Sequence, residues 1–70
     1  MSKKLFTIGK NIKKYRLKKG ISQDKLSKLA GVALYTVTKI ESGATLDPRI
    51  ETVQKIANAL SVGVDDLLKR

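Results

Sequence analysis

The spacing of the apolar residues is the feature that most limits how this chain can fold. In the first segment they recur at intervals of three and four residues, at Leu5, Ile8, Ile12 and Tyr15. This spacing places them on one stripe of a helix. Lysines fill many positions off the stripe, and Gly20 stands where a left-handed residue commonly ends a helix. The pattern predicts a first helix over residues 5–19.

A second, shorter helix is predicted over residues 23–30. Ser22 is placed to act as its N-cap, and Asp24 lies in the first turn, where the helix dipole favours an anion. The residues expected to be buried are Leu26, Leu29 and Ala30. Gly31 then ends the helix after about two turns, so packing rather than intrinsic propensity must hold it.

The stretch GVALYTVTKIESG, from Gly31 to Gly43, is rich in residues that favour strands. As a strand, however, it has no cleanly alternating face, and no other segment shows a period of two that would supply a partner strand. As a helix, it has a stripe at intervals of four, three and four residues, formed by Ala33, Val37, Ile40 and Ala44. The sequence therefore predicts a third helix over residues 33–42, which lacks a capping side chain at its start.

Two further helices complete the predicted domain. Asp47 is a good N-cap and Pro48 suits a first helical position, which predicts a helix over residues 48–60. Its expected buried stripe consists of Ile50, Val53, Ile56, Ala57 and Leu60. A short final helix is expected over residues 64–69. The fold class predicted is therefore all-α, with five helices in one compact domain over residues 1–70.

The positive charge is concentrated in the first part of the chain. The formal net charge is +9; residues 1–28 contain ten Lys or Arg and one acidic residue, whereas residues 29–70 contain five of each sign. Such an asymmetry favours a basic surface for a phosphate backbone or an anionic membrane surface. A lysine-rich face that only increases solubility is the alternative.

Several classes of function lack the residues that they need. The chain has no Cys and no His, which removes the commonest zinc ligands, thiol nucleophiles and imidazole acid–base groups. With six carboxylates and no phosphate-binding loop, we expect no enzyme, no cofactor and no metal site. No apolar run approaches the ~18 residues of a membrane span, so we expect a cytoplasmic protein that makes no membrane contact.

Two short helices joined by a tight turn at Gly31-Val32, within a small basic helical domain, are typical of a helix-turn-helix. The sequence resembles the Xre-type family of bacterial regulators, which includes the Cro proteins and the lambdoid phage repressors. The stretches that carry the resemblance are IGKNIKKYRLKKGISQDKLSKLAGV, TVTKIESG and DPRIETVQKIANAL with VGVDDLL. It implies a lambda-repressor-like domain that inserts its third helix into the major groove of double-stranded DNA. It also implies a nucleoid-associated transcriptional regulator, a repressor or controller, acting as a homodimer on a near-palindromic operator.

The resemblance also implies which residues meet DNA. At base edges and flanking positions these are Gln23, Leu34, Tyr35, Thr36, Thr38, Lys39 and Arg49. The residues expected at phosphates are Lys10, Lys13, Lys14, Lys28 and the Thr45 hydroxyl. Residues 1–4 are expected to form a basic arm around the duplex or to be disordered.

Two further groups of residues have structural roles in the related repressors. Arg16 and Glu41 match a pair of charges that links the first and third helices, so the resemblance implies a structural ion pair. The candidates for dimer contacts are Leu46, Val64, Leu67 and Leu68, of which the last three have core packing as the alternative.

Leu34 departs from the family, which commonly has Gln or Arg at this position. A leucine cannot make the paired hydrogen bonds by which Arg reads guanine or Gln reads adenine, and it can at most touch a thymine methyl group. Our hypothesis from the sequence is therefore an A·T-rich half-site or a dependence on DNA shape. The alternative function is a protein-interaction module, such as an antitoxin, that uses Leu34 and Tyr35 as its contact surface.

Overall fold

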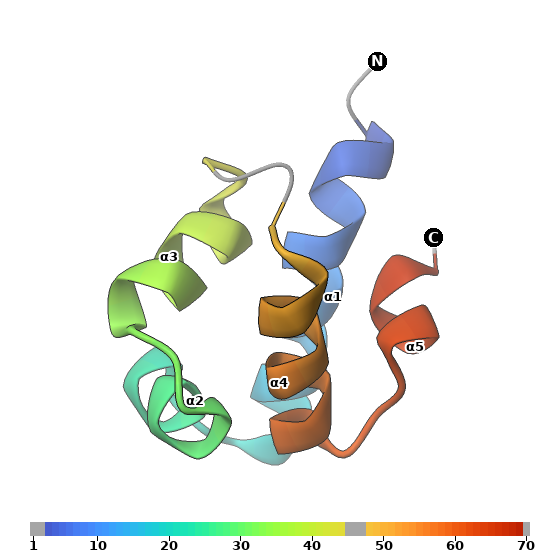
Figure 1. The fold of residues 1–70 in the computed structure, drawn as a ribbon. Helices are drawn as coiled ribbons and strands as arrows, with labels where there is room; N and C mark the ends of the chain where they lie inside the picture. Colours follow the sequence, from blue (N-terminus) through green and yellow to red (C-terminus); the bar gives the residue numbers. More distant parts are fainter. Residues whose placement is uncertain (1–2, 45–47, 70) are drawn as a thin grey trace.

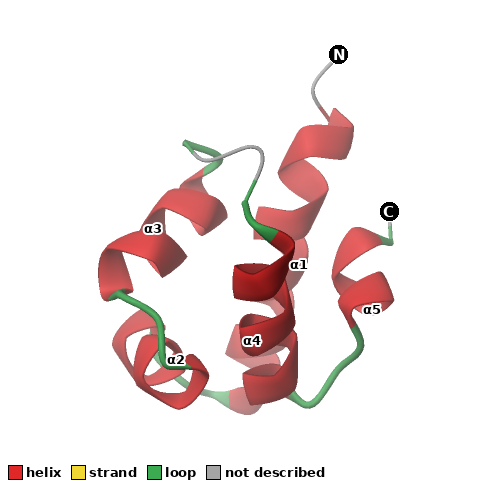
Figure 2. Ribbon diagram, in the orientation of Figure 1, coloured by secondary structure: helices red, strands yellow, loops and turns green. Residues whose placement is uncertain are grey.

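The structure is a computed structural model that describes residues 3–44 and 48–69, with side chains from residue 8 onward in these ranges. Within these ranges, five helices follow one another (Figure 1). They are α1 (Lys3–Lys19), α2 (Gln23–Ala30), α3 (Leu34–Ser42), α4 (Ile50–Leu60) and α5 (Val64–Leu68). The described residues form no strand, so the prediction of an all-α fold is confirmed (Figure 2). Within the same ranges, no helix has both the length and the apolar character that crossing a membrane requires.

The long helix α1 and the helix α4 form the centre of the domain. The pair α2 and α3 packs against them, α2 mainly on α4 and α3 mainly on α1. On the other side, α5 packs on α1 and α4, so that α3 and α5 lie at opposite sides of the domain (Figure 1). This arrangement leaves one side of α3 uncovered by the other helices.

Each of the five helices contributes to one apolar core. Its buried members are Ile12, Leu26, Ala30, Val37, Ile40, Val53, Ile56, Ala57, Leu60 and Leu67. Most of the stripe residues predicted from the sequence are therefore in the core. The stretch from Gly31 to Gly43 also forms a helix, since Val37 and Ile40 can be buried only on the side of α3 that faces α1 and α2.

Four of the predicted stripe residues are exposed, which corrects the prediction at these positions. Leu29 is 53% exposed and Ile50 is 67% exposed, and Ala33 and Ala44 are also exposed. In α2 the third inward position is taken by Ser27, whose hydroxyl donates a hydrogen bond of 2.7 Å to the Asp24 carbonyl. Because that hydroxyl has a partner, its burial carries no penalty for an unpaired polar group.

Besides α3, which begins at Leu34 with Ala33 as its N-cap rather than at residue 33, three helix boundaries differ from the prediction. α1 begins at Lys3 rather than at residue 5, so Lys3 and Lys4 belong to the helix and not to a separate arm. No Gly or Pro interrupts the chain between Lys3 and the first apolar stripe, which allows the helix to extend. At the other end, α5 stops at Leu68 because Lys69 is extended, with φ −71° and ψ 143°.

The start of α4 is the third difference. Pro48 lies outside the helix: α4 begins at Ile50, and Arg49 is the N-cap, whose carbonyl accepts a hydrogen bond of 3.0 Å from the Val53 amide. A proline at the first helical position and a proline just before the helix both leave no backbone donor unpaired, so the sequence does not distinguish them. The predicted N-cap, Asp47, lies outside the described residues.

The turn between α2 and α3 depends on a left-handed residue. Gly31 has φ 71° and ψ 33°, a conformation that costs glycine little and other residues more. It allows the Val32 amide to donate a hydrogen bond of 3.0 Å to the Ser27 carbonyl, which closes the end of α2. The chain then turns at once into α3, so the two helices of the motif have a fixed relation.

The helix α5 has five residues and is too short to be stable alone. Besides Leu67 in the core, two side chains hold its ends. Asn11 of α1 donates hydrogen bonds to the carbonyls of Leu67 (2.8 Å) and Lys69 (2.6 Å). At the start, an Asp66 carboxylate oxygen accepts a 2.9 Å hydrogen bond from the Gly63 amide, which holds the pKa of Asp66 below its ordinary value of 3.8. The stability that this hydrogen bond gives to the folded state is fully present above the ordinary pKa of 3.8. It is lost as the pH falls through the lowered pKa of Asp66.

The backbones of α1 and α3 approach each other closely at Gly9, a buried residue. A Cβ atom at this position would overlap the Ile40 carbonyl oxygen and would lie 3.3 Å from the Cα atom of Glu41. Only a residue without a side chain fits there, and this contact sets how near α1 lies to α3.

We expect Gly9→Ala to lower the free energy of unfolding by about 1–3 kcal/mol, because the added methyl group forces the two helices apart. In an unobstructed helix the same change would raise stability by about 1 kcal/mol, so the sign of the effect is decisive. Urea denaturation measures it, with Asn58→Ala at an exposed position of α4 as the control. A Gly9→Ala protein as stable as the wild type would contradict the close approach.

Candidate nucleic-acid interface

The helix α3 has three different environments around its circumference. Val37 and Ile40 are buried against the core, with exposed fractions of 0% and 2%. On the opposite side, Leu34 is 43% exposed and Tyr35 is 69% exposed. A buried polar network lies between these sides and contains Glu41. The exposed side is the part of α3 that a ligand can reach.

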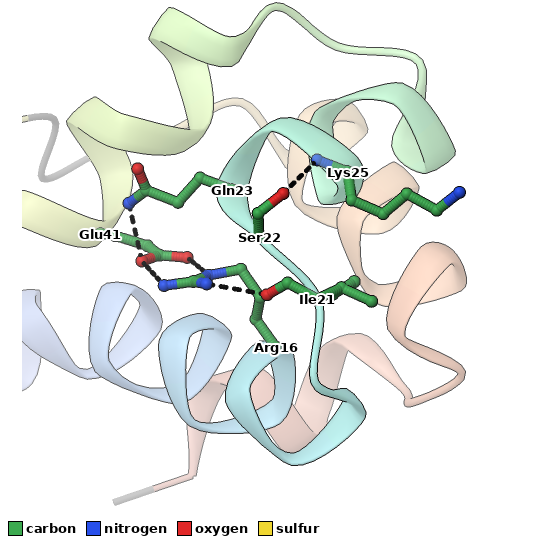
Figure 3. A network of polar contacts seen from close by, with 6 residues as sticks. All are labelled: Arg16, Ile21, Ser22, Gln23, Lys25 and Glu41. Atoms are coloured by element: carbon green, nitrogen blue, oxygen red, sulfur yellow. Dashed lines mark hydrogen bonds and ion pairs between the residues drawn. The ribbon is translucent and has the colours of Figure 1, made fainter.

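Arg16 of α1 and Glu41 of α3 form this network's central ion pair. Arg16 Nε lies 2.7 Å from one carboxylate oxygen of Glu41, and Nη2 donates to the other at 3.0 Å (Figure 3). The remaining terminal nitrogen, Nη1, donates to the Ile21 carbonyl at 2.9 Å. The side chains are only 9% and 4% exposed. Both charges are therefore removed from water, and each nitrogen of the guanidinium has a partner.

Gln23, the first residue of α2, extends the network. Its side-chain amide donates a 3.0 Å hydrogen bond to Glu41, to the same oxygen that accepts from Arg16 Nη2. An ionised carboxylate only accepts hydrogen bonds, so the amide nitrogen of Gln23 must face Glu41. Its amide oxygen then points away from the ion pair, as Figure 3 shows. Gln23 thus connects α2 to α3 and retains a free acceptor at the surface.

The start of α2 is fixed beside this network. Ser22 has the extended conformation of an N-cap, and its hydroxyl accepts a hydrogen bond of 3.0 Å from the Lys25 amide (Figure 3). By contrast, Ala33 at the start of α3 makes no side-chain cap, and the Ala33 carbonyl accepts from the amides of Thr36 and Val37. The first turn of α3 is therefore held by its backbone and by packing.

Two surface hollows flank the exposed side of α3. The first, of about 450 Å³, lies over the ion pair and is lined by Lys13, Arg16, Gln23, Thr38, Glu41 and Ser42. The second, of about 280 Å³, lies between α3 and the start of α4 and is lined by Tyr35, Thr36, Lys39, Ile40, Pro48, Arg49 and Thr52. Together they bring most of the residues predicted near base edges to one side of the molecule, and Leu34 is exposed on the same helix.

Within the second hollow, Tyr35 and Lys39 contact each other across one turn of α3. Lys39 Nζ donates a hydrogen bond of 3.1 Å to the Tyr35 hydroxyl oxygen and lies 4.9 Å from the ring centroid. The Thr38 hydroxyl, in contrast, donates to the Tyr35 carbonyl of its own helix at 2.9 Å. Thr38 and Lys39 are both half-buried, whereas Tyr35 is 69% exposed, so Tyr35 is the most accessible of these three side chains.

The lysines predicted at phosphates are exposed but differ in their surroundings. Lys10, Lys13 and Lys14 are exposed on α1. Lys28 of α2 lies 3.3 Å from Asp24, in an ion pair whose side chains are 75% and 58% exposed. An exposed pair of this kind is weak, so Lys28 can exchange its partner for a phosphate at small cost. Thr45 lies outside the described residues.

The described candidates for dimer contacts differ in their exposure. Leu67 is 0% exposed and belongs to the core, because α5 needs an apolar anchor between α1 and α4, so of the two roles that the sequence left open it has core packing and not the dimer contact. Val64 is half-buried and packs against the same core. Leu68 is 51% exposed and stays a candidate, whereas Leu46 lies outside the described residues.

The geometry corresponds to a known family. A sequence model described as helix-turn-helix matches residues 12–67, which is most of the chain and includes α2, the turn and α3. The chain belongs to the Xre-type helix-turn-helix family. Membership of this family agrees with the expectation that the protein is not an enzyme.

Two curated relatives from Bacillus subtilis (strain 168) are similar in sequence. The transcriptional regulator SinR is 39% identical over 61 residues, which cover 87% of this chain and 55% of SinR. The uncharacterised SPbeta prophage-derived regulator YonR is 36% identical over 61 residues, which cover 87% of this chain and 56% of YonR. The chain thus spans about half the length of the curated relatives it matches.

Solved structures show the same arrangement of helices. The N-terminal DNA-binding domain of SinR from Bacillus subtilis superposes with a TM-score of 0.89 at 37% identity, over 93% of this chain and 94% of that domain. A matched chain from the complex of SinR with SinI gives a TM-score of 0.86 at 38% identity, over 90% of this chain and 61% of that chain. The restriction-modification controller C.AhdI from Aeromonas hydrophila gives 0.84 at 28% identity, over 90% and 94%.

Asn11 is a residue whose role the sequence analysis missed. Its contacts with the end of α5 hold that helix, although nothing in the sequence pattern singles it out. An asparagine in a helix is ordinarily a solvated residue, and its partners lie more than 50 residues away along the chain.

We expect Arg16→Met to lower the free energy of unfolding by about 3–5 kcal/mol, since it leaves the Glu41 carboxylate buried without its partner. Arg16→Met combined with Glu41→Leu should recover much of the loss, because no buried charge remains. Urea denaturation of the wild type, the two single variants Arg16→Met and Glu41→Leu, and the double variant gives the coupling free energy of the pair. Lys28→Met, which breaks the exposed pair with Asp24, is the matched control and should cost less than about 1 kcal/mol. Equal losses from Arg16→Met and Lys28→Met would show that the central pair is not desolvated.

Proposed function

We propose that this protein binds double-stranded DNA sequence-specifically, as a transcriptional regulator that inserts α3 into the major groove. The observation that carries the proposal is the exposed side of α3, which projects from the domain while Glu41 and Gln23 hold the helix in place. An α-helix fits the major groove, and base edges are read by side chains on its outer face. The DNA-binding domain of SinR, which shares this fold, supports the same assignment.

Affinity that does not depend on sequence would come from the basic residues around α3. Lys10, Lys13 and Lys14 on α1 and Arg49 before α4 displace counterions from the phosphates. At the start of α2, beside the first hollow, the backbone amide of Gln23 can donate to a phosphate oxygen, whereas its side-chain amide oxygen is an acceptor and does not bind phosphate. These contacts position the helix, and the exposed residues of α3 then discriminate among bases.

The proposal includes a homodimer on a near-palindromic operator. Two copies related by a two-fold axis would place their α3 helices about 34–36 Å apart, one turn of DNA. Among the described residues predicted at the dimer contact, Leu68 is the exposed one, and its side chain can therefore meet a second copy. Such a protein acts in the cytoplasm at the nucleoid.

A protein partner is the second candidate function. Leu34 and Tyr35 are adjacent, apolar in large part and exposed, a combination that also occurs at protein interfaces. One structural neighbour is SinR in complex with the protein SinI, so a domain of this fold occurs in a protein–protein complex. The two functions differ in a measurable way, because a protein surface requires no preferred DNA sequence.

Selection of bound duplexes from a randomised pool tests the proposal. We expect a near-palindromic winner that binds about 10³-fold or more tightly than scrambled DNA at physiological salt. Replacement of Lys14 by Met should weaken binding to all duplexes alike and reduce the slope of log K against log [salt] by about one. Lys55→Met, an exposed position of α4 that we do not place at DNA, is the matched control. Equal affinity for the winner and for scrambled DNA would contradict sequence-specific binding and favour the protein partner.

A further inference from the structure

We propose that Tyr35 and Lys39 act together as a two-donor unit that reads one guanine in each half-site. The inference rests on the proposed function and specifies the base that α3 recognises. It starts from their mutual hydrogen bond, in which Lys39 Nζ lies 3.1 Å from the Tyr35 hydroxyl oxygen. The two groups are one helical turn apart and line the same hollow beside α4.

The direction of this hydrogen bond determines what the pair can offer to a ligand. A lysine ammonium has three donors and no acceptor, so the Tyr35 oxygen must accept from it. The phenolic proton then points away from Lys39 and is available to a third group. Lys39 keeps two further N–H donors. The exposed end of the pair is consequently a donor from each residue, close enough together to address one base.

The neighbouring groups strengthen this donor character. Thr38 donates its hydroxyl proton to the Tyr35 carbonyl at 2.9 Å, and Ser42 donates its own to the Lys39 carbonyl at 3.1 Å. Both carbonyls are already hydrogen-bonded from within α3 and are not presented to a ligand. The other charged group in the hollow, the Arg49 guanidinium, has donors only. A ligand at this position therefore needs hydrogen-bond acceptors.

Guanine matches two neighbouring donors better than any other base. Its major-groove edge presents two acceptors, N7 and O6. Adenine places an amino donor beside its single acceptor, cytosine presents an amino donor, and thymine offers one acceptor next to a methyl group. The pair thus substitutes for the arginine or glutamine that Leu34 replaces at the previous position. If the pair reads a guanine, the hypothesis of an A·T-rich half-site applies only to the base pairs that Leu34 touches.

Phosphate oxygens are also acceptors, and the test must separate them from a base edge. Loss of a phosphate contact weakens binding to every sequence equally, whereas loss of a base contact lowers discrimination at one base pair. Tyr35 and Lys39 suit such a test, because Tyr35 is 69% exposed and neither residue belongs to the core. Thermal melts of the variants should therefore match the melt of the wild type.

The experiment uses the selected operator with 7-deazaguanine, which lacks the N7 acceptor, placed at one guanine at a time. For the wild type we expect one guanine in each half-site where this change, or replacement by adenine, costs about 5- to 150-fold in affinity. Tyr35→Phe and Lys39→Met should each abolish most of that penalty. Tyr15→Phe removes the other tyrosine hydroxyl of the chain, on α1, and should keep the full penalty.

Two results would overturn the inference while the proposed function stands. One is an operator at which Tyr35→Phe and Lys39→Met retain every base preference of the wild type. The other is an equal loss of affinity for selected and scrambled duplexes, which would assign the pair to a phosphate. Failure of the proposed function itself is distinct, since the wild type would then select no sequence from the pool.

Discussion

The ion pair between Arg16 and Glu41 is the interaction on which the arrangement of this domain depends. It joins α1 to α3 and also fixes the start of α2, because Arg16 donates to the Ile21 carbonyl and Gln23 donates to Glu41. α2 and α3 have eight and nine residues and are too short to be stable alone. A buried pair in which each guanidinium nitrogen has a partner disfavours other relative positions of these helices, because a shift would leave a charge uncompensated in a dry environment.

The division of α3 among three tasks follows from this arrangement. One side supplies Val37 and Ile40 to the core, another supplies Glu41 to the network, and the third is left for a ligand. A short helix can present a precise outer face only when its other two faces are immobilised. The close approach at Gly9 contributes to the same result, since it brings the backbone of α1 against α3 close to Glu41.

The candidate site could be predicted in part from the sequence. The residues at the outer face of α3 and the ion pair followed from the resemblance to the Xre-type family, and their sequence spacing already placed Tyr35 and Lys39 one turn apart. The direction of the hydrogen bond between Lys39 and Tyr35 required coordinates, as did the shared hollow with Arg49. Exposure at the end of the chain was also undetermined, because Leu67 and Leu68 are adjacent leucines and only packing shows that the first is buried.

The sequence by itself determined the elements of this protein: five helices, their order and the glycine turn between α2 and α3. These features depend on spacings of three and four residues and on left-handed glycines, which are local properties. Only the tertiary structure decided the edges of each apolar stripe, where Leu29 and Ile50 are exposed and Ser27 is buried, and the capping of α5 by Asn11. A stripe indicates which side of a helix faces inward, but its width depends on neighbouring helices that are distant in the sequence.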